Sequence, residues 1–66
     1  MFNNIRMKQL RKEKGLTQLQ LSEMLGYKNN SVANIEKGSI NPSFDKIVKL
    51  AEIFNVEITE LIRKEK

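Results

Sequence analysis

Carboxamide side chains gather in one short stretch of this chain, where a helical pattern begins. Asn29, Asn30 and Asn34 lie there, on faces that a hydrophobic core does not need. A carboxamide both donates and accepts hydrogen bonds, so it can bind a partner that offers the complementary pattern. Asparagine is also a mediocre helix former, so three of them in one short helix need another reason. The stretch indicates a surface that recognises a ligand, and a merely solvated helix is the alternative.

The remaining residue types exclude most catalytic chemistry. The chain has 66 residues, with no cysteine and no histidine. This removes thiolate metal sites, the usual general base and the commonest zinc ligand. The sequence also lacks a carboxylate pair in a plausible cleft and a glycine-rich phosphate loop. We therefore expect one domain, residues 1–66, that is not an enzyme and holds no metal or cofactor.

Nothing in the sequence indicates a membrane-bound or secreted protein. No apolar run approaches the length of about 20 residues that spans a bilayer. The first residues match neither a signal peptide nor a lipidation site. No residues remain for a ligand-sensing domain. We therefore expect a cytoplasmic protein with no membrane partner and no small-molecule ligand.

The positive charge is unevenly distributed. Residues 1–38 carry seven basic and three acidic residues, whereas residues 39–66 carry five of each, so the first segment holds the whole net charge of +4. Positive charge beside a recognition surface is typical of nucleic-acid binding. A net charge this small, taken alone, favours a surface that is charged only for solubility.

The spacing of apolar residues predicts five helices joined by short turns. They are expected at about residues 4–14, 17–25, 29–37, 44–54 and 57–63. Gly15 and Gly26 follow the first two, at the position just past a helix end. Ser43 is the expected N-cap of the fourth helix, and Asn55 is its expected left-handed end. Residues 64–66 are expected to fray.

The second and third predicted helices have different start signals. Thr17 and Gln20 fit a capping box at the start of the second helix. Lys28 stands where a serine or threonine cap of the third helix is expected, so Asn29 or Asn30 is the candidate cap. An asparagine that caps a helix is less free to bind a ligand.

The order and spacing of these motifs resemble the lambda-repressor-like helix-turn-helix family of the XRE and Cro type. The run LTQLQLSEMLGY at 16–27 resembles the family's LTQ-x-x-LA-x-x-LG opening, and IEKG at 35–38 resembles its closing motif. The run NPSFDKIVKLAEIFNV at 41–56 resembles the segment that follows. As a set these motifs are specific. The resemblance implies an all-α, compact five-helix domain with its helix-turn-helix at about 17–37.

The resemblance also implies that the chain binds double-stranded DNA, with the third helix in the major groove. The family's base-reading positions fall on Asn29, Asn30, Ala33 and Asn34. The positions that contact the DNA backbone fall on Gln18, Lys28, Ser31, Lys37, Asn41 and Ser43. An asparagine can pair with adenine, and an alanine can touch a thymine methyl. For each lysine, a solvated surface charge is an equally good interpretation.

Three further residues have structural roles by this resemblance. Arg11 and Glu36 match a pair that forms a structural salt bridge between the first and third helices of the family. Ser22 lies where the family usually has alanine, on the inner face of the second helix. Its hydroxyl is expected to bond back to the carbonyl of Gln18.

One such domain touches only a few base pairs, so we expect a homodimer on a palindromic site. Phe54, Ile58 and Ile62 are the candidate interface residues, although Ile58 can instead close the core of the monomer. The expected function is a sequence-specific transcriptional regulator, most simply a repressor. A protein-interaction module or an antitoxin component is the alternative, because a fold alone does not decide function.

Overall fold

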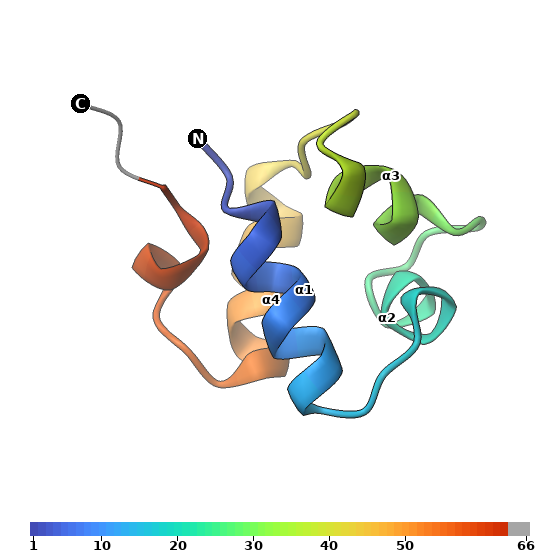
Figure 1. Cartoon of the computed structure of the whole chain (residues 1–66), viewed down its shortest axis with the longest axis horizontal. Coiled ribbons are helices and arrows are strands. Elements are labelled where there is room, and N and C mark those ends of the chain that lie inside the picture. The colour runs from blue at the N-terminus through green and yellow to red at the C-terminus, as the bar shows by residue number, and fades with distance from the viewer. Residues whose placement is uncertain (64–66) are drawn as a thin grey trace.

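The computed structural model describes residues 1–63, which form four α-helices and one short 3-10 helix (Figure 1). The elements in chain order are α1 (Asn4–Glu13), α2 (Gln18–Met24), α3 (Ser31–Lys37), α4 (Phe44–Phe54) and the 3-10 helix η1 (Ile58–Leu61). The predicted all-α architecture and the order of its elements are confirmed. The prediction for residues 64–66 lies outside the described residues. None of the helices within 1–63 is long and apolar enough to cross a membrane.

Local capping signals set the helix ends as predicted. The hydroxyl of Thr17 accepts from the N–H of Gln20 at 3.0 Å, and the N–H of Thr17 donates to the Gln20 side chain at 2.8 Å. This reciprocal pair is the predicted capping box. Ser43 accepts from the N–H of Lys46, and Asn55 ends α4 in the left-handed conformation. Thr17 and Gln20 therefore fix the start of α2, and Ser43 and Asn55 fix the two ends of α4.

Two of the predicted helices have wrong bounds: the third begins later than expected, and the last is shorter. The third helix begins at Ser31 rather than at residue 29, because the N–H of Ser31 donates to the carbonyl of Asn29 (2.9 Å) in a tight turn that precedes the helix. The last helix covers only Ile58–Leu61 instead of 57–63. Its end is diverted, because Ile62 forms an antiparallel bridge with Phe2. Backbone groups that bond to the N-terminal segment are not available to extend a helix.

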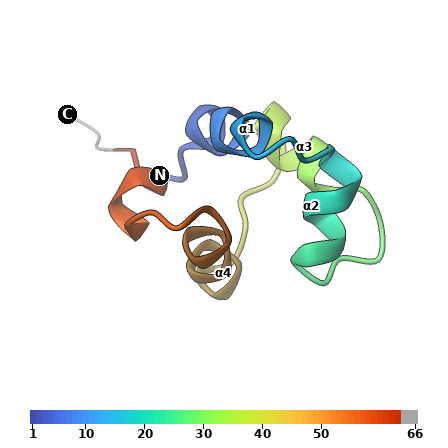
Figure 2. The same ribbon diagram turned by 90° about the horizontal axis from the view of Figure 1, so that it is seen from below.

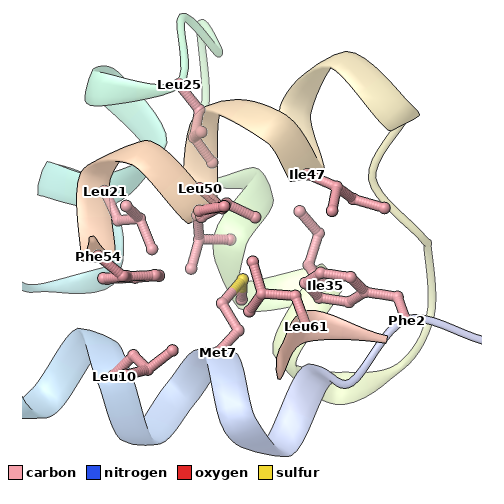
Figure 3. Packing of buried hydrophobic residues seen from close by; sticks show 12 residues of the cluster. Phe2, Met7, Leu10, Leu21, Leu25, Ile35, Ile47, Leu50, Phe54 and Leu61 are labelled. Atoms are coloured by element: carbon pink, nitrogen blue, oxygen red, sulfur yellow. The ribbon is translucent and has the colours of Figure 1, made fainter. Parts of the chain in front are cut away.

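The core fills the space that all five elements enclose. Met7 of α1, Leu50 of α4 and Leu61 of η1 are fully buried and meet near its centre (Figure 3). A second group of fully buried residues comes from α2, its C-cap and α3: Leu21, Ser22, Leu25, Val32 and Ile35. Figures 1 and 2 place η1 at one end of the molecule and the α2–α3 pair at the other. A chain this short buries only about 60% of its unfolded surface, so each of these contacts matters.

Candidate nucleic-acid interface

The turn between α2 and α3 is tight and is held from α4. Gly26 has a φ of +85°, which only glycine adopts without strain, and the N–H of Tyr27 donates to the carbonyl of Ser22 at 3.0 Å. Lys46 of α4 donates its Nζ to the carbonyl of Leu25 at 2.7 Å. The same Nζ lies 5.1 Å from the centre of the Tyr27 ring, within the range of a cation–π contact. Burial raises the pKa of Tyr27 above its ordinary value.

The carboxamides predicted to recognise bases reach the surface beyond this turn. Asn29, Asn30 and Asn34 are exposed, and Ala33 is half-buried. Asn29 and Asn30 precede α3 rather than lie inside it, so they extend the surface toward the turn. The structure thus brings all four residues to the turn before α3 and its first four residues, and leaves the three asparagines exposed.

A buried hydroxyl lies beneath these carboxamides. Ser22 is completely buried, and its Oγ accepts from the N–H of Val32 at 3.0 Å. It also donates to Oδ1 of Asn30 at 3.2 Å. The predicted bond from Ser22 back to Gln18 is therefore wrong, because α3 supplies partners for both the oxygen and the hydrogen of this hydroxyl.

Glu36 joins three helices through one carboxylate. Arg11 of α1 donates Nε to Oε2 at 2.6 Å and Nη2 to Oε1 at 3.2 Å, and both side chains are almost fully buried. Arg11 also donates Nη1 to the carbonyl of Leu16 at 2.7 Å. Gln18 at the start of α2 donates Nε2 to Oε1 of Glu36 at 2.9 Å. The structure thus brings Arg11 and Glu36 together as a two-point ion pair, the geometry that suits arginine and a carboxylate best.

Comparison with known proteins shows which family has this arrangement. A family described as helix-turn-helix matches residues 7–61. The chain belongs to the lambda-repressor-like helix-turn-helix family. It is 34% identical over 56 residues to a protein of Archaeoglobus fulgidus named an uncharacterized HTH-type transcriptional regulator. The matched stretch covers 85% of this chain and 80% of that protein. It is also 32% identical over 60 residues to the immunity repressor protein of Bacillus phage phi105. That match covers 91% of this chain and 42% of the phage protein.

The fold has a close counterpart among solved structures. The restriction-modification controller protein C.AhdI from Aeromonas hydrophila superposes with a TM-score of 0.77 at 36% identity, over 89% of each chain. The chain spans most of that controller and of the archaeal regulator, but less than half of the phage repressor. The helix-turn-helix of this family is thus α2, the turn at Gly26 and α3.

The six residues that the resemblance assigned to contacts with the DNA backbone differ in exposure and in hydrogen bonding. Lys28, Lys37 and Asn41 are exposed. Gln18 is oriented by its bond to Glu36, and one of the two hydrogens on its Nε2 is used there. The hydroxyl of Ser31 donates to Oδ1 of Asn29 at 2.5 Å. That of Ser43 caps α4.

Of the three candidate dimer-interface residues, Ile58 and Ile62 belong to or directly follow η1, whereas Phe54 ends α4 and lies on the side of Leu10 and Leu21 (Figure 3). Phe54 is 7% exposed and belongs to the core, so it offers little surface to a second copy. Ile58 is half-buried against the same core. Ile62 is 39% exposed and is the most accessible of the three.

Two residues that position the helix-turn-helix carried no signal in the sequence. Lys46 reaches the turn from α4, twenty residues beyond Gly26, and it fits no local motif. Asn4 donates Nδ2 to the carbonyl of Glu36 at 3.0 Å and so covers the end of α3 from the start of α1. Both bonds join distant parts of the chain, and only the folded structure brings the partners together.

Proposed function

We propose that this protein is a sequence-specific, double-stranded DNA-binding transcriptional regulator that acts as a repressor. One observation carries the proposal: Asn29, Asn30 and Asn34 are exposed together at the start of α3. In helix-turn-helix proteins that bind DNA, the N-terminal residues of this helix contact base edges in the major groove. The names of the relatives support a regulator, since one is an immunity repressor and the structural neighbour is a controller protein.

The charge around this surface favours a polyanionic partner. Lys28 precedes the carboxamides and Lys37 ends α3, and both are exposed. The segment up to residue 38 carries the entire net charge of the chain. Lysines near the groove release counterions from the phosphates, which supplies affinity without sequence preference. In this proposal the lysines supply affinity, the carboxamides supply specificity, and the protein acts in the cytoplasm.

A homodimer on a palindromic operator completes the proposal. The η1 end, with Ile62 exposed, lies opposite the α2–α3 pair along the longest axis of the molecule (Figures 1 and 2). Two copies that meet at this end leave both copies of α3 free. Such dimers bind two half-sites about 34–36 Å apart, one turn of the DNA helix.

Selection of random duplexes with the purified chain tests the proposal. We expect the wild-type protein to enrich a palindrome, and Asn29→Ala and Asn30→Ala each to lose preference at discrete base positions. Binding should weaken as salt rises, with a log–log slope of about −0.9 for each phosphate neutralised. No preference among duplexes and no steep salt dependence would contradict the proposal and favour the alternative, a protein-interaction module or antitoxin component.

A further inference from the structure

The start of α3 is capped in an unusual way. The first N–H groups of a helix have no partner inside the helix, and the side chain of the N-cap residue commonly accepts from one of them. Asn30 is the N-cap of α3 and belongs to a preferred residue type, yet its side chain makes no capping bond. The N–H of Val32 donates instead to Ser22 of α2. A buried serine on one helix therefore caps the next, and the carboxamide of Asn30 is released from that role.

The same serine also orients the released carboxamide. Oγ of Ser22 accepts from the N–H of Val32 and donates its own hydrogen to Oδ1 of Asn30 at 3.2 Å. Among residues 1–63, every buried side-chain nitrogen and oxygen has such a partner. The bonds thus run in one direction, from N–H to hydroxyl to carbonyl. This direction turns the oxygen of Asn30 toward the protein, and the two hydrogens on Nδ2 remain for an outside acceptor.

Asn29 has a parallel arrangement. Its Oδ1 accepts from the hydroxyl of Ser31 at 2.5 Å. Both asparagines before α3 therefore have their carbonyl oxygens engaged by serine hydroxyls. Asn34, further along the helix, has no such serine partner among the bonds of the described residues.

We propose that Ser22 is a specificity-determining positioning residue, which makes Asn30 read its base as a hydrogen-bond donor. The proposal rests on the proposed function and names the chemistry of the base. Adenine pairs with an asparagine that offers both its oxygen and its nitrogen, whereas guanine presents two acceptors, N7 and O6, in the major groove. A carboxamide whose oxygen is held by the protein offers Nδ2 donors, which match the two acceptors of guanine. Asn30 therefore selects guanine instead of the adenine that the residue type alone suggests.

Base analogues in the selected duplex test the chemistry directly. The base pair read by Asn30 is the one whose preference disappears in Asn30→Ala. We expect guanine there, and replacement by 7-deazaguanine, which lacks the N7 acceptor, should weaken wild-type binding by about fivefold. The same analogue should not affect Asn30→Ala. Adenine at this position, with a loss of binding when its N6 amino group is removed, would overturn the inference.

Ser22→Ala tests the role of the hydroxyl, with Ser39→Ala as the control at an exposed serine of the α3–α4 loop. Without the hydroxyl, Asn30 is free to turn back and cap α3. We expect Ser22→Ala to lose preference at the same base pair as Asn30→Ala, the double variant to lose no more, and Ser39→Ala to keep it. An equal loss at every base position, or an unchanged preference, would overturn the inference. If Ser22→Ala does not fold by circular dichroism, the result with 7-deazaguanine decides.

These outcomes separate the inference from the proposed function. A chain that prefers no duplex refutes both. If the chain has a defined operator but Asn30 contacts its base through an N6 amino group, the proposed function stands and only this inference is refuted.

Discussion

Glu36 connects α3 to two other helices through its side chain. Its carboxylate accepts from Arg11 at two points and from Gln18 at one, and its side chain is 4% exposed. A buried charge of this kind is tolerated only when it is paired and hydrogen-bonded. The carboxylate of Glu36 therefore links α1, α2 and α3 to one another.

Glu36→Gln should destabilise the protein strongly. The change leaves the guanidinium of Arg11 buried without a counter-charge, and breaking a buried pair in this way costs about 3–5 kcal/mol. Urea unfolding followed by circular dichroism measures the loss. Glu60→Gln is the matched control, because the pair of Glu60 with Arg6 is solvent-exposed and is expected to contribute at most about 1 kcal/mol. Equal effects of the two variants would contradict this role of Glu36.

Tyr27 gives a prediction about pH. Burial raises its pKa in the folded chain, so the folded state keeps its phenolic proton to a higher pH than the unfolded state does. The contribution of Tyr27 to stability is therefore complete below the unfolded pKa and is lost as the pH rises through the folded pKa. Tyr27 is the only tyrosine and the chain has no tryptophan, so tyrosinate absorbance reports this residue alone. Its midpoint should lie higher in buffer than in concentrated urea, and coincident midpoints would contradict the burial.

At the scale of the elements, α4 braces the turn through which α2 leads into α3. Lys46 is the side chain that does so, by its bond to Leu25 and its position over Tyr27. A cation also suits this position, because the C-terminal end of a helix carries a partial negative charge. The turn that carries Lys28, Asn29 and Asn30 is thus anchored to a third helix.

Lys46→Met should loosen this turn while keeping the length of the side chain. We expect a loss of about 1–2 kcal/mol of stability and a change in Tyr27 fluorescence. Lys49→Met, at an exposed lysine of the same helix, is the control and should change neither. Operator affinity should fall in Lys46→Met with an unchanged salt slope. A slope reduced by about 0.9 would instead mean that Lys46 binds a phosphate.

Helix ends that nearby side chains set can be predicted from a sequence, whereas ends that a distant residue sets cannot. Thr17, Gln20, Ser43 and Asn55 act close to themselves in the chain, so their patterns predicted the start of α2 and both ends of α4. The start of α3 depends on Ser22, a residue of another helix, and this was not predictable from the types of Asn29 and Asn30. Among the candidate DNA-contacting residues, the exposure of the asparagines followed from the amphipathic pattern. Their hydrogen-bond partners did not, because those partners meet only in the folded chain.

At the scale of the whole molecule, the two ends of the described chain are joined opposite the helix-turn-helix. The N–H of Asn3 donates to the carbonyl of Leu61 at 2.7 Å, and that of Arg63 to the carbonyl of Met1 at 2.6 Å. These bonds and the bridge between Phe2 and Ile62 hold η1 against the start of α1. The fold therefore separates the helix-turn-helix from the η1 end, at which we propose that two copies meet.

Ile62→Asp tests this division. In the proposed dimer the exposed side chain of Ile62 lies in the interface, so a buried carboxylate should shift the chain toward the monomer in sedimentation equilibrium. Ile40→Asp is the control, at an isoleucine of similar exposure in the α3–α4 loop, and should not change the mass. If Ile62→Asp and the wild-type chain sediment alike, the η1 end is not the interface.

The most direct test of the account follows the side-chain amides of the asparagines by NMR as the selected duplex is added to the ¹⁵N-labelled chain. The account predicts that the NH₂ resonances of Asn29, Asn30 and Asn34 shift with the selected duplex and move less with a scrambled one. Asn55, exposed at the far end of α4, serves as the internal reference and should not shift. Unchanged resonances of the three asparagines at saturating duplex would contradict base recognition at the start of α3.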